Sequence, residues 1–228
     1  MQRQMDHCAG SILKSPNKMR RLEMARAASV EQVLKTRFKM LPFEGEWLSA
    51  FGRPELTGSW IIWGNSGNGK TRFALQLCKY LCKFGRVAYN SLEEGVSASL
   101  MKALQETNMM EVRRKFVVLD KEPIDELTER LKKEKSPNIV CIDSLQYTGM
   151  NYDEYKRLKE LFPNKLFIYI SHADGKHPEG RVAKKVRFDS NIKIFVQGYR
   201  AEPVSRYGGG EPYIIWKEGY EKFSMENI

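Results

Sequence analysis

The fold class follows from one stretch, Gly64-Asn65-Ser66-Gly67-Asn68-Gly69-Lys70-Thr71, which has the form Gly-x4-Gly-Lys-Thr. An apolar run, Ser59-Trp60-Ile61-Ile62-Trp63, precedes it, and a helical pattern follows it. Glycines let the backbone turn tightly, so that several N–H groups point inward at phosphate oxygens. The first turn of the following helix adds the positive end of its dipole. The sequence therefore predicts a phosphate-binding loop between a buried strand and a helix.

Two residues at the end of this stretch have specific expected roles. We expect Lys70 to reach the β- and γ-phosphates of a nucleotide and Thr71 to ligate Mg²⁺. The predicted cofactors are therefore ATP and Mg²⁺. The residues expected to contact the nucleotide are Gly64, Asn65, Ser66, Gly67, Asn68, Gly69, Lys70, Thr71 and Arg72.

Apolar runs alternate with helical patterns through most of the chain. Strand–helix alternation of this kind is typical of an α/β fold with a mainly parallel sheet covered by helices on both faces. In such sheets ligands bind at the carboxyl ends of the strands. The predicted strands are 56–63, 86–91, 116–119, 139–142, 166–170, 192–196 and 213–216, and the predicted helices between them are 70–83, 96–108, 123–133 and 153–161.

Acidic residues follow two of these strands. Asp143 comes directly after Ile139-Val140-Cys141-Ile142, and a carboxylate at the end of a buried strand is costly unless it serves a cation. We expect Asp143 to hold Mg²⁺ together with Thr71. Glu93 and Glu94 follow the strand 86–91, where a carboxylate can deprotonate an attacking water. Glu93 is favoured as this catalytic base, although both acids also suit a helix start.

His172 follows the apolar run Phe167-Ile168-Tyr169-Ile170 at another strand end. A polar side chain there is expected to sense the γ-phosphate, with a purely structural histidine as the alternative. The segment from Ser171 to Asp189 reads as a long polar loop, and loops of this length in compact domains are usually functional or mobile. Its basic residues are the candidates for DNA binding: Lys176, Arg181, Lys184, Lys185 and Arg187.

The formal net charge of +10 is concentrated at the amino-terminal end. Residues 1–40 contain nine basic and three acidic residues, an excess of six. A helical pattern runs from Lys18 to about Phe38, and prolines and glycines between 42 and 54 indicate a loop region. We therefore expect a basic helical arm over 1–42 and an ATPase domain over 43–228. Such an arm suits a polyanion such as nucleic acid, and the alternative is a solvated helical arm that packs on the domain or on a neighbouring subunit.

The chain contains no run of about 18 apolar residues, which predicts that no segment spans a membrane. The amino terminus has no apolar stretch behind its charges, so a secretory signal is not expected either. The expected location is the cytoplasm.

Taken together, these pieces resemble the RecA-like ATPase superfamily, which includes the RecA and RadA recombinases and the DnaB-type helicases. Three runs carry the likeness beyond the phosphate loop, and the resemblance covers about 56–223. Ser91-Leu92-Glu93 looks like the catalytic glutamate of the helicase branch, and Ile142-Asp143-Ser144-Leu145-Gln146 is similar to the Walker B run of RadA proteins. Val204-Ser205-Arg206-Tyr207-Gly208 resembles their Lys-Asn-Arg-Phe-Gly run, with Val204 in place of the lysine.

The resemblance implies a core that assembles into a ring or filament of identical subunits, with ATP held between neighbours. Arg206 would then act on the γ-phosphate of a neighbouring subunit. The basic segment 172–189 would match the mobile DNA-binding loop of the family, which makes single-stranded DNA the expected partner. The chain resembles a minimal core of the kind used by phages and mobile elements.

The predicted function is a DNA-dependent ATPase acting in recombination, repair or replication. Two alternatives are a regulatory ATPase that remodels or signals to a protein partner, and a small-molecule phosphotransferase. The sequence does not separate a recombinase from an annealing factor or a helicase-type motor, because all three share one ATP site. It also leaves open the number of subunits, the DNA strand preference and the role of residues 1–40.

Overall fold

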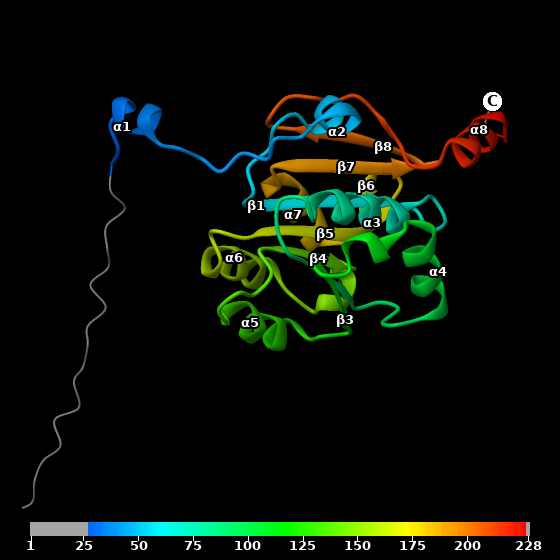
Figure 1. The fold of residues 1–228 in the computed structure, drawn as a ribbon, viewed down its shortest axis with the longest axis horizontal. Helices are drawn as coiled ribbons and strands as arrows, with labels where there is room; N and C mark the ends of the chain where they lie inside the picture. Colours follow the sequence, from blue (N-terminus) through cyan, green and yellow to red (C-terminus); the bar gives the residue numbers. More distant parts are fainter. Residues whose placement is uncertain (1–26, 227–228) are drawn as a thin grey trace, which may run out of the picture. The chain divides into compact units, whose positions relative to one another are not determined.

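The computed structural model describes residues 27–226, and the chain divides into two units, residues 1–37 and 38–228 (Figure 1). The described part of the first unit contains α1 (Val30–Lys35). Ser29 caps it through a reciprocal pair of hydrogen bonds with Gln32, and none of its side chains is buried. The predicted helix over 18–38 is therefore wrong at its end, because Thr36 leaves the helix in an extended conformation. Residues 18–26 of that prediction lie outside the described residues.

The second unit is built on a mixed sheet. Its strands lie in the order β3-β2-β4-β5-β1-β7-β8-β9, with β6 paired to β5. From β3 to β7 all neighbouring strands in this order are parallel. β8 pairs antiparallel with β7, and β9 pairs antiparallel with β8. The strands are β1 (Gly58–Gly64), β2 (Val87–Ser91), β3 (Phe116–Asp120), β4 (Ile139–Asp143), β5 (Leu166–Asp174), β6 (His177–Pro178), β7 (Ile192–Gln197), β8 (Arg200–Ser205) and β9 (Tyr213–Ile214).

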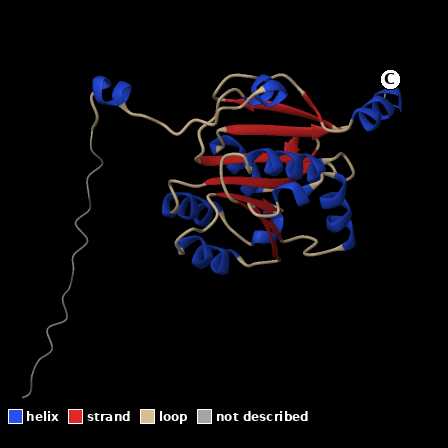
Figure 2. Ribbon diagram, viewed as in Figure 1, coloured by secondary structure: helices blue, strands red, loops and turns tan. Residues whose placement is uncertain are grey.

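Helices cover both faces of this sheet (Figures 1 and 2). Side chains of α2, α3, α4 and η1 pack on one face, and side chains of α5, η2, α6 and α7 pack on the other. The prediction of an α/β fold with a mostly parallel sheet between helices is confirmed. The helical segments are α2 (Gly45–Phe51), α3 (Lys70–Leu81), α4 (Ala98–Glu106), η1 (Met109–Val112), α5 (Ile124–Lys132), η2 (Leu145–Thr148), α6 (Tyr152–Leu161), α7 (Arg181–Asp189) and α8 (Lys217–Glu226).

The central strands are buried on both faces, as continuous apolar runs predict for a parallel sheet. Trp60 and Ile62 of β1 point into one core and Ile61 into the other, and all three are fully buried. Most predicted element ends in the alternating region are within a residue or two. The exception is β5, which continues four residues beyond the predicted end at Ile170.

The predicted polar loop over 171–189 is wrong. β5 runs on to Asp174, turns through Gly175, and returns as the short strand β6, after which α7 begins at Arg181. The helix forms because Ala183 and Val186, three residues apart, are buried against the sheet. The sequence pattern did not indicate this helix, because its two buried residues stand among many basic ones.

A buried tyrosine fastens α7 to the rest of the fold. The hydroxyl of Tyr155, on α6, lies 2.7 Å from Ser59 Oγ of β1 and donates to Asp189 Oδ2 at 2.6 Å. Lys159 also binds the Asp189 carboxylate. One polar cluster therefore joins α6, α7 and the strand that leads into the phosphate loop.

Three further elements differ from the sequence prediction. α2 lies inside the predicted loop region 42–54, and β8 and α8 were not predicted at all. α2 exists because Ala50 and Phe51 are buried in the core, while Trp47 stacks on Tyr80 at 4.9 Å. In the residues described, no helix is both long and apolar enough to cross a bilayer.

Removing the Tyr155 hydroxyl tests whether this cluster holds α7 in place. We expect Tyr155→Phe to lower the free energy of unfolding by about 1–3 kcal/mol, because it leaves the buried Ser59 hydroxyl without its partner. Urea denaturation measures the change. Tyr152→Phe, on the same helix, is the matched control, because no hydrogen bond involves that hydroxyl among the described residues. Equal stability of the two variants would contradict the assignment.

Candidate active site

The loop predicted to bind phosphate, called the phosphate loop below, lies between β1 and α3, which is the predicted placement. Gly67 and Gly69 have φ values of 75° and 94°, a region in which other residues are strained. Asn68 fixes the loop to the turn between β7 and β8: its side-chain oxygen accepts from the Gly198 N–H at 2.7 Å, and its carbonyl accepts from the Tyr199 N–H at 3.1 Å. The loop is therefore held in shape by a strand pair more than 100 residues further along the chain.

Lys70 is the first residue of α3 and bridges the loop. Its ammonium donates to the carbonyl oxygen of Asn65 at 2.9 Å. Burial lowers the pKa of Lys70 from its ordinary value, and the nearby carboxylates of Asp143 and Glu93 oppose that shift. A poorly solvated ammonium at a helix start is an arrangement that can bind an anion.

Asp143 lies at the carboxyl end of β4 and faces this loop. Burial raises the pKa of the Asp143 carboxyl to about 6, although the hydroxyl of Tyr89, which donates to Asp143 Oδ2, opposes the shift. Glu93 and Glu94 also disfavour its ionised form. Asp143 is therefore a buried carboxyl with two further carboxylates near it, an arrangement that favours a cation.

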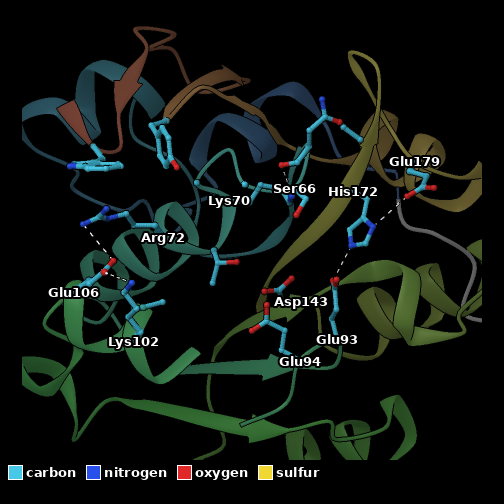
Figure 3. A pocket seen from close by; sticks show the side chains of 18 residues that line it. Ser66, Lys70, Arg72, Glu93, Glu94, Lys102, Glu106, Asp143, His172 and Glu179 are labelled. Carbon is cyan, nitrogen blue, oxygen red and sulfur yellow. Dashed lines mark hydrogen bonds and ion pairs between the residues drawn. The ribbon is translucent and has the colours of Figure 1, made fainter. Parts of the chain in front are cut away.

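The two glutamates after β2 have different partners (Figure 3). Glu93 Oε2 lies 2.9 Å from His172 Nε2 and accepts from Ser144 Oγ at 3.1 Å. Glu94 instead accepts from the hydroxyls of Ser97 and Ser99 at the start of α4. Glu94 therefore stabilises a helix start, and Glu93 is oriented by groups from two neighbouring strand ends.

His172 lies on β5, opposite Gly64 of the phosphate loop strand. Besides its contact with Glu93, its Nδ1 lies 3.5 Å from Glu179 Oε2 (Figure 3). Glu179 was not predicted as a site residue. Its carbonyl accepts from the Gln146 side chain at 3.1 Å, and α7 begins two residues later. His172 thus connects the candidate base to the start of the basic helix.

These groups border one cleft of about 850 Å³. At its other end the guanidinium of Arg72 lies 5.2 Å from the ring centre of Trp216 and pairs with Glu106 at 3.8 Å. Tyr199 meets Trp216 edge to face at 5.1 Å. Sequence reasoning missed this aromatic wall of Tyr199 and Trp216, because one lies in the turn between β7 and β8 and the other just before α8. The residues lining the cleft are Asn65, Ser66, Gly67, Gly69, Lys70, Thr71, Arg72, Glu93, Glu94, Lys102, Ala103, Glu106, Asp143, His172, Ala173, Glu179, Tyr199 and Trp216.

The basic candidates for DNA binding lie on the β5–β6 hairpin and α7. The side chains of Lys176, Arg181, Lys184 and Lys185 are exposed. Arg187 is half-buried, with its guanidinium 5.1 Å from the ring centre of Trp63, so it serves packing. The prediction that these residues sit on a mobile loop is therefore corrected: they sit on an ordered hairpin and helix.

Arg206 lies away from the cleft of its own chain. It follows β8, which is antiparallel to β7, and Ser205 pairs with Ile192 at the amino end of β7. The phosphate loop follows the carboxyl end of β1, which is parallel to β7. Arg206 is therefore at the opposite end of the sheet, where it donates to Asn191 Oδ1 at 3.3 Å.

The donors present suit a nucleotide with a divalent cation. Thr71 and Asp143 line the same cleft and offer the oxygen ligands that Mg²⁺ prefers. Among residues 27–226, no group of three or more His, Cys, Asp or Glu side chains is arranged to hold a metal by itself. Magnesium held by Thr71 and Asp143 would take its other ligands from phosphate oxygens and water.

No protein-family model and no curated protein matches the chain.

The raised pKa of Asp143 makes a prediction about stability without nucleotide. A carboxyl whose pKa is about 6 when folded and about 3.9 when unfolded costs the fold nothing well below pH 4 and about 3 kcal/mol by pH 7. We expect Asp143→Asn to remove this cost, so that the variant gains stability over the wild type as the pH rises from about 4 to 7.

Denaturation of both proteins across this range measures the difference. Asp153→Asn is the control, because the ion pair with Lys156 lowers the pKa of that exposed carboxyl. That variant should show no gain over the wild type between pH 4 and 7, because a lowered pKa places its pH dependence below that range. A pH-independent difference for Asp143→Asn would contradict the assignment.

Proposed function

We propose that the chain is an ATP hydrolase with a RecA-like P-loop core whose activity depends on single-stranded DNA. The observation that carries the hydrolase proposal is the convergence of Lys70, Asp143 and Glu93 on one cleft at the carboxyl ends of parallel strands. A phosphate cradle, a cation ligand and a candidate base are the parts that phosphoryl transfer to water requires.

ATP would lie along the cleft from the phosphate loop towards the aromatic wall. The loop N–H groups and the start of α3 would bind the phosphates, with Lys70 moving from the Asn65 carbonyl to the phosphate oxygens. The base would rest against Tyr199 and Trp216. Mg²⁺ held by Thr71 and Asp143 would neutralise phosphate charge.

Glu93 would act as the general base. A water oxygen attacks the γ-phosphorus, the bond from that phosphorus to the bridging oxygen breaks, and its electron pair leaves with ADP. The proton of the water passes to the Glu93 carboxylate. The hydrogen bonds from His172 and Ser144 orient this carboxylate, which favours catalysis by positioning.

The dependence on DNA is supported by charge and by the path from His172. Lys176, Arg181, Lys184 and Lys185 present four exposed cations on one hairpin and one helix. Glu179 precedes that helix and contacts His172, which in turn contacts Glu93. A polyanion bound to α7 would thereby be linked to the candidate base, and His172 would act as the sensor.

The position of Arg206 supports assembly into a ring or filament. It cannot reach the cleft of its own chain from the opposite end of the sheet. A role on the γ-phosphate would therefore require the cleft of a neighbouring copy, as the resemblance implies.

One observation favours a second candidate, a regulatory ATPase that acts on a protein partner. The basic segment is a packed helix, with Lys184 paired to Asp174 at 3.4 Å and Lys185 lying 5.0 Å from the ring centre of Tyr152. A pre-formed helix is a surface that proteins also recognise.

Replacing the candidate base tests the mechanism. We expect Glu93→Gln to lower the steady-state rate of ATP hydrolysis by about 10²–10⁴-fold, because the amide cannot accept the proton of the water. Glu94→Gln is the control, and it should retain most activity, since Glu94 binds the start of α4. The reverse order of the two variants would assign the base to Glu94.

Single-stranded DNA should stimulate hydrolysis, and the paired substitution Lys184→Ala with Lys185→Ala should abolish the stimulation. Phosphate release with and without DNA measures this, with Lys70→Ala as the inactive blank. Lys217→Ala with Lys222→Ala removes the same charge from α8 and serves as the control. Hydrolysis that is indifferent to DNA would contradict the proposal and favour the regulatory ATPase.

A further inference from the structure

A second concentration of positive charge lies at the amino ends of β2 and β3. A hollow of about 500 Å³ is bordered by Lys83, just after α3, and by the loop Arg113–Lys115 that leads into β3. Arg86 precedes β2 next to Lys115, because the Val87 N–H donates to the Lys115 carbonyl at 2.8 Å. All five of these side chains are exposed.

These five cations have no acidic partners. None of them forms an ion pair with any residue in the described part of the chain. The only acid bordering the hollow among those residues is Glu111, and its charge is already matched by Lys79 at 2.9 Å.

The neutral contacts of the cations leave their charge in place. The ammonium of Lys83 lies 4.7 Å from the ring centre of Tyr80, and the guanidinium groups of Arg86 and Arg113 donate to backbone carbonyls at 2.7 and 3.2 Å. Five like charges crowded on one surface cost free energy unless an anion binds there.

We propose that this hollow binds the phosphate backbone of single-stranded nucleic acid. Most of the side chains that line the hollow are basic, and Val112, which is half-buried, is the one apolar side chain in its lining besides the buried Cys82. A protein partner needs an apolar centre in its interface. Phosphates need only cations, and contacts of that kind position a strand without reading its bases.

The hollow is separated from the candidate active site by the length of the sheet. β2, β4, β5 and β1 are parallel, so the starts of β2 and β3 lie at the edge opposite the phosphate loop. Five residues of strand span about 16 Å. A backbone bound here does not touch the nucleotide of the same subunit, so the hollow acts as an anchor whose affinity is independent of ATP. The inference shares with the proposed function only the class of the partner.

The test compares two full-length triple variants. The hollow variant removes three positive charges from the lining through Arg113→Ala, Arg114→Ala and Lys115→Ala. Lys132→Ala, Lys217→Ala and Lys222→Ala remove the same charge from lysines that already pair with glutamates. Binding to a fluorescent oligothymidylate of about 30 nucleotides is measured by anisotropy between about 50 and 200 mM salt, with and without ATP.

We expect the hollow variant to bind about 10- to 100-fold more weakly than wild type near 0.1 M salt. Its plot of log affinity against log salt should be less steep by about 2, since each lost phosphate contact lowers the slope by about 0.7. The loss should be the same with and without ATP, and hydrolysis without DNA should be unchanged. The control variant should retain most of the affinity.

Each of the following results would overturn the inference. Equal losses in the two variants would mean that only net charge matters, and no loss would mean that DNA binds elsewhere. Loss of binding to a polyglutamate peptide but not to DNA would assign the hollow to an acidic protein. DNA-stimulated hydrolysis that persists in the hollow variant with unchanged affinity would refute this inference alone, whereas a wild type that binds no DNA would also refute the DNA dependence proposed above.

Discussion

The parallel direction of four neighbouring strands places the whole candidate site. β2, β4, β5 and β1 lie side by side in that order, and their carboxyl ends bring Glu93, Asp143, His172 and the loop 64–71 to one edge of the sheet. Reversing one strand would send its polar group to the other edge, which is where the antiparallel β8 leaves Arg206. Helices on both faces hold this arrangement, because the strands are apolar on both sides and each face needs a cover that keeps its core from water.

Two charged groups of the candidate site, Asp143 and Lys70, lie where burial disfavours their charged forms. Burial raises the pKa of Asp143 and lowers that of Lys70, so each group is held in a setting that disfavours its charged form. The hydroxyl of Tyr89 and the carbonyl of Asn65 offset part of this cost. A nucleotide with its cation would supply the remaining counter-charges, which is how a binding site converts stability of the fold into affinity for its ligand.

The parts of the site that could be predicted from sequence were those carried by local pattern. The loop 64–71 and Asp143 each follow an apolar strand, so their place at a strand end could be predicted without knowing which strands are neighbours. The partners of Glu93 and Glu94 could not be predicted, because they depend on contacts with His172 and with the start of α4. The places of Trp216 and Glu179 in the cleft could not be predicted either, because they depend on contacts with distant segments of the chain.

The sequence by itself determined the alternation of strands and helices, the mostly parallel sheet and the glycine-rich turn between β1 and α3, because periodicity and glycine spacing act over a few residues. Only the tertiary structure decided that 181–189 is a helix and 45–51 is another. In both cases a short apolar stripe amid polar or turn-forming residues is too weak to specify a helix alone. Burial against a sheet assembled from distant segments supplies the missing free energy, as Val186 and Phe51 show.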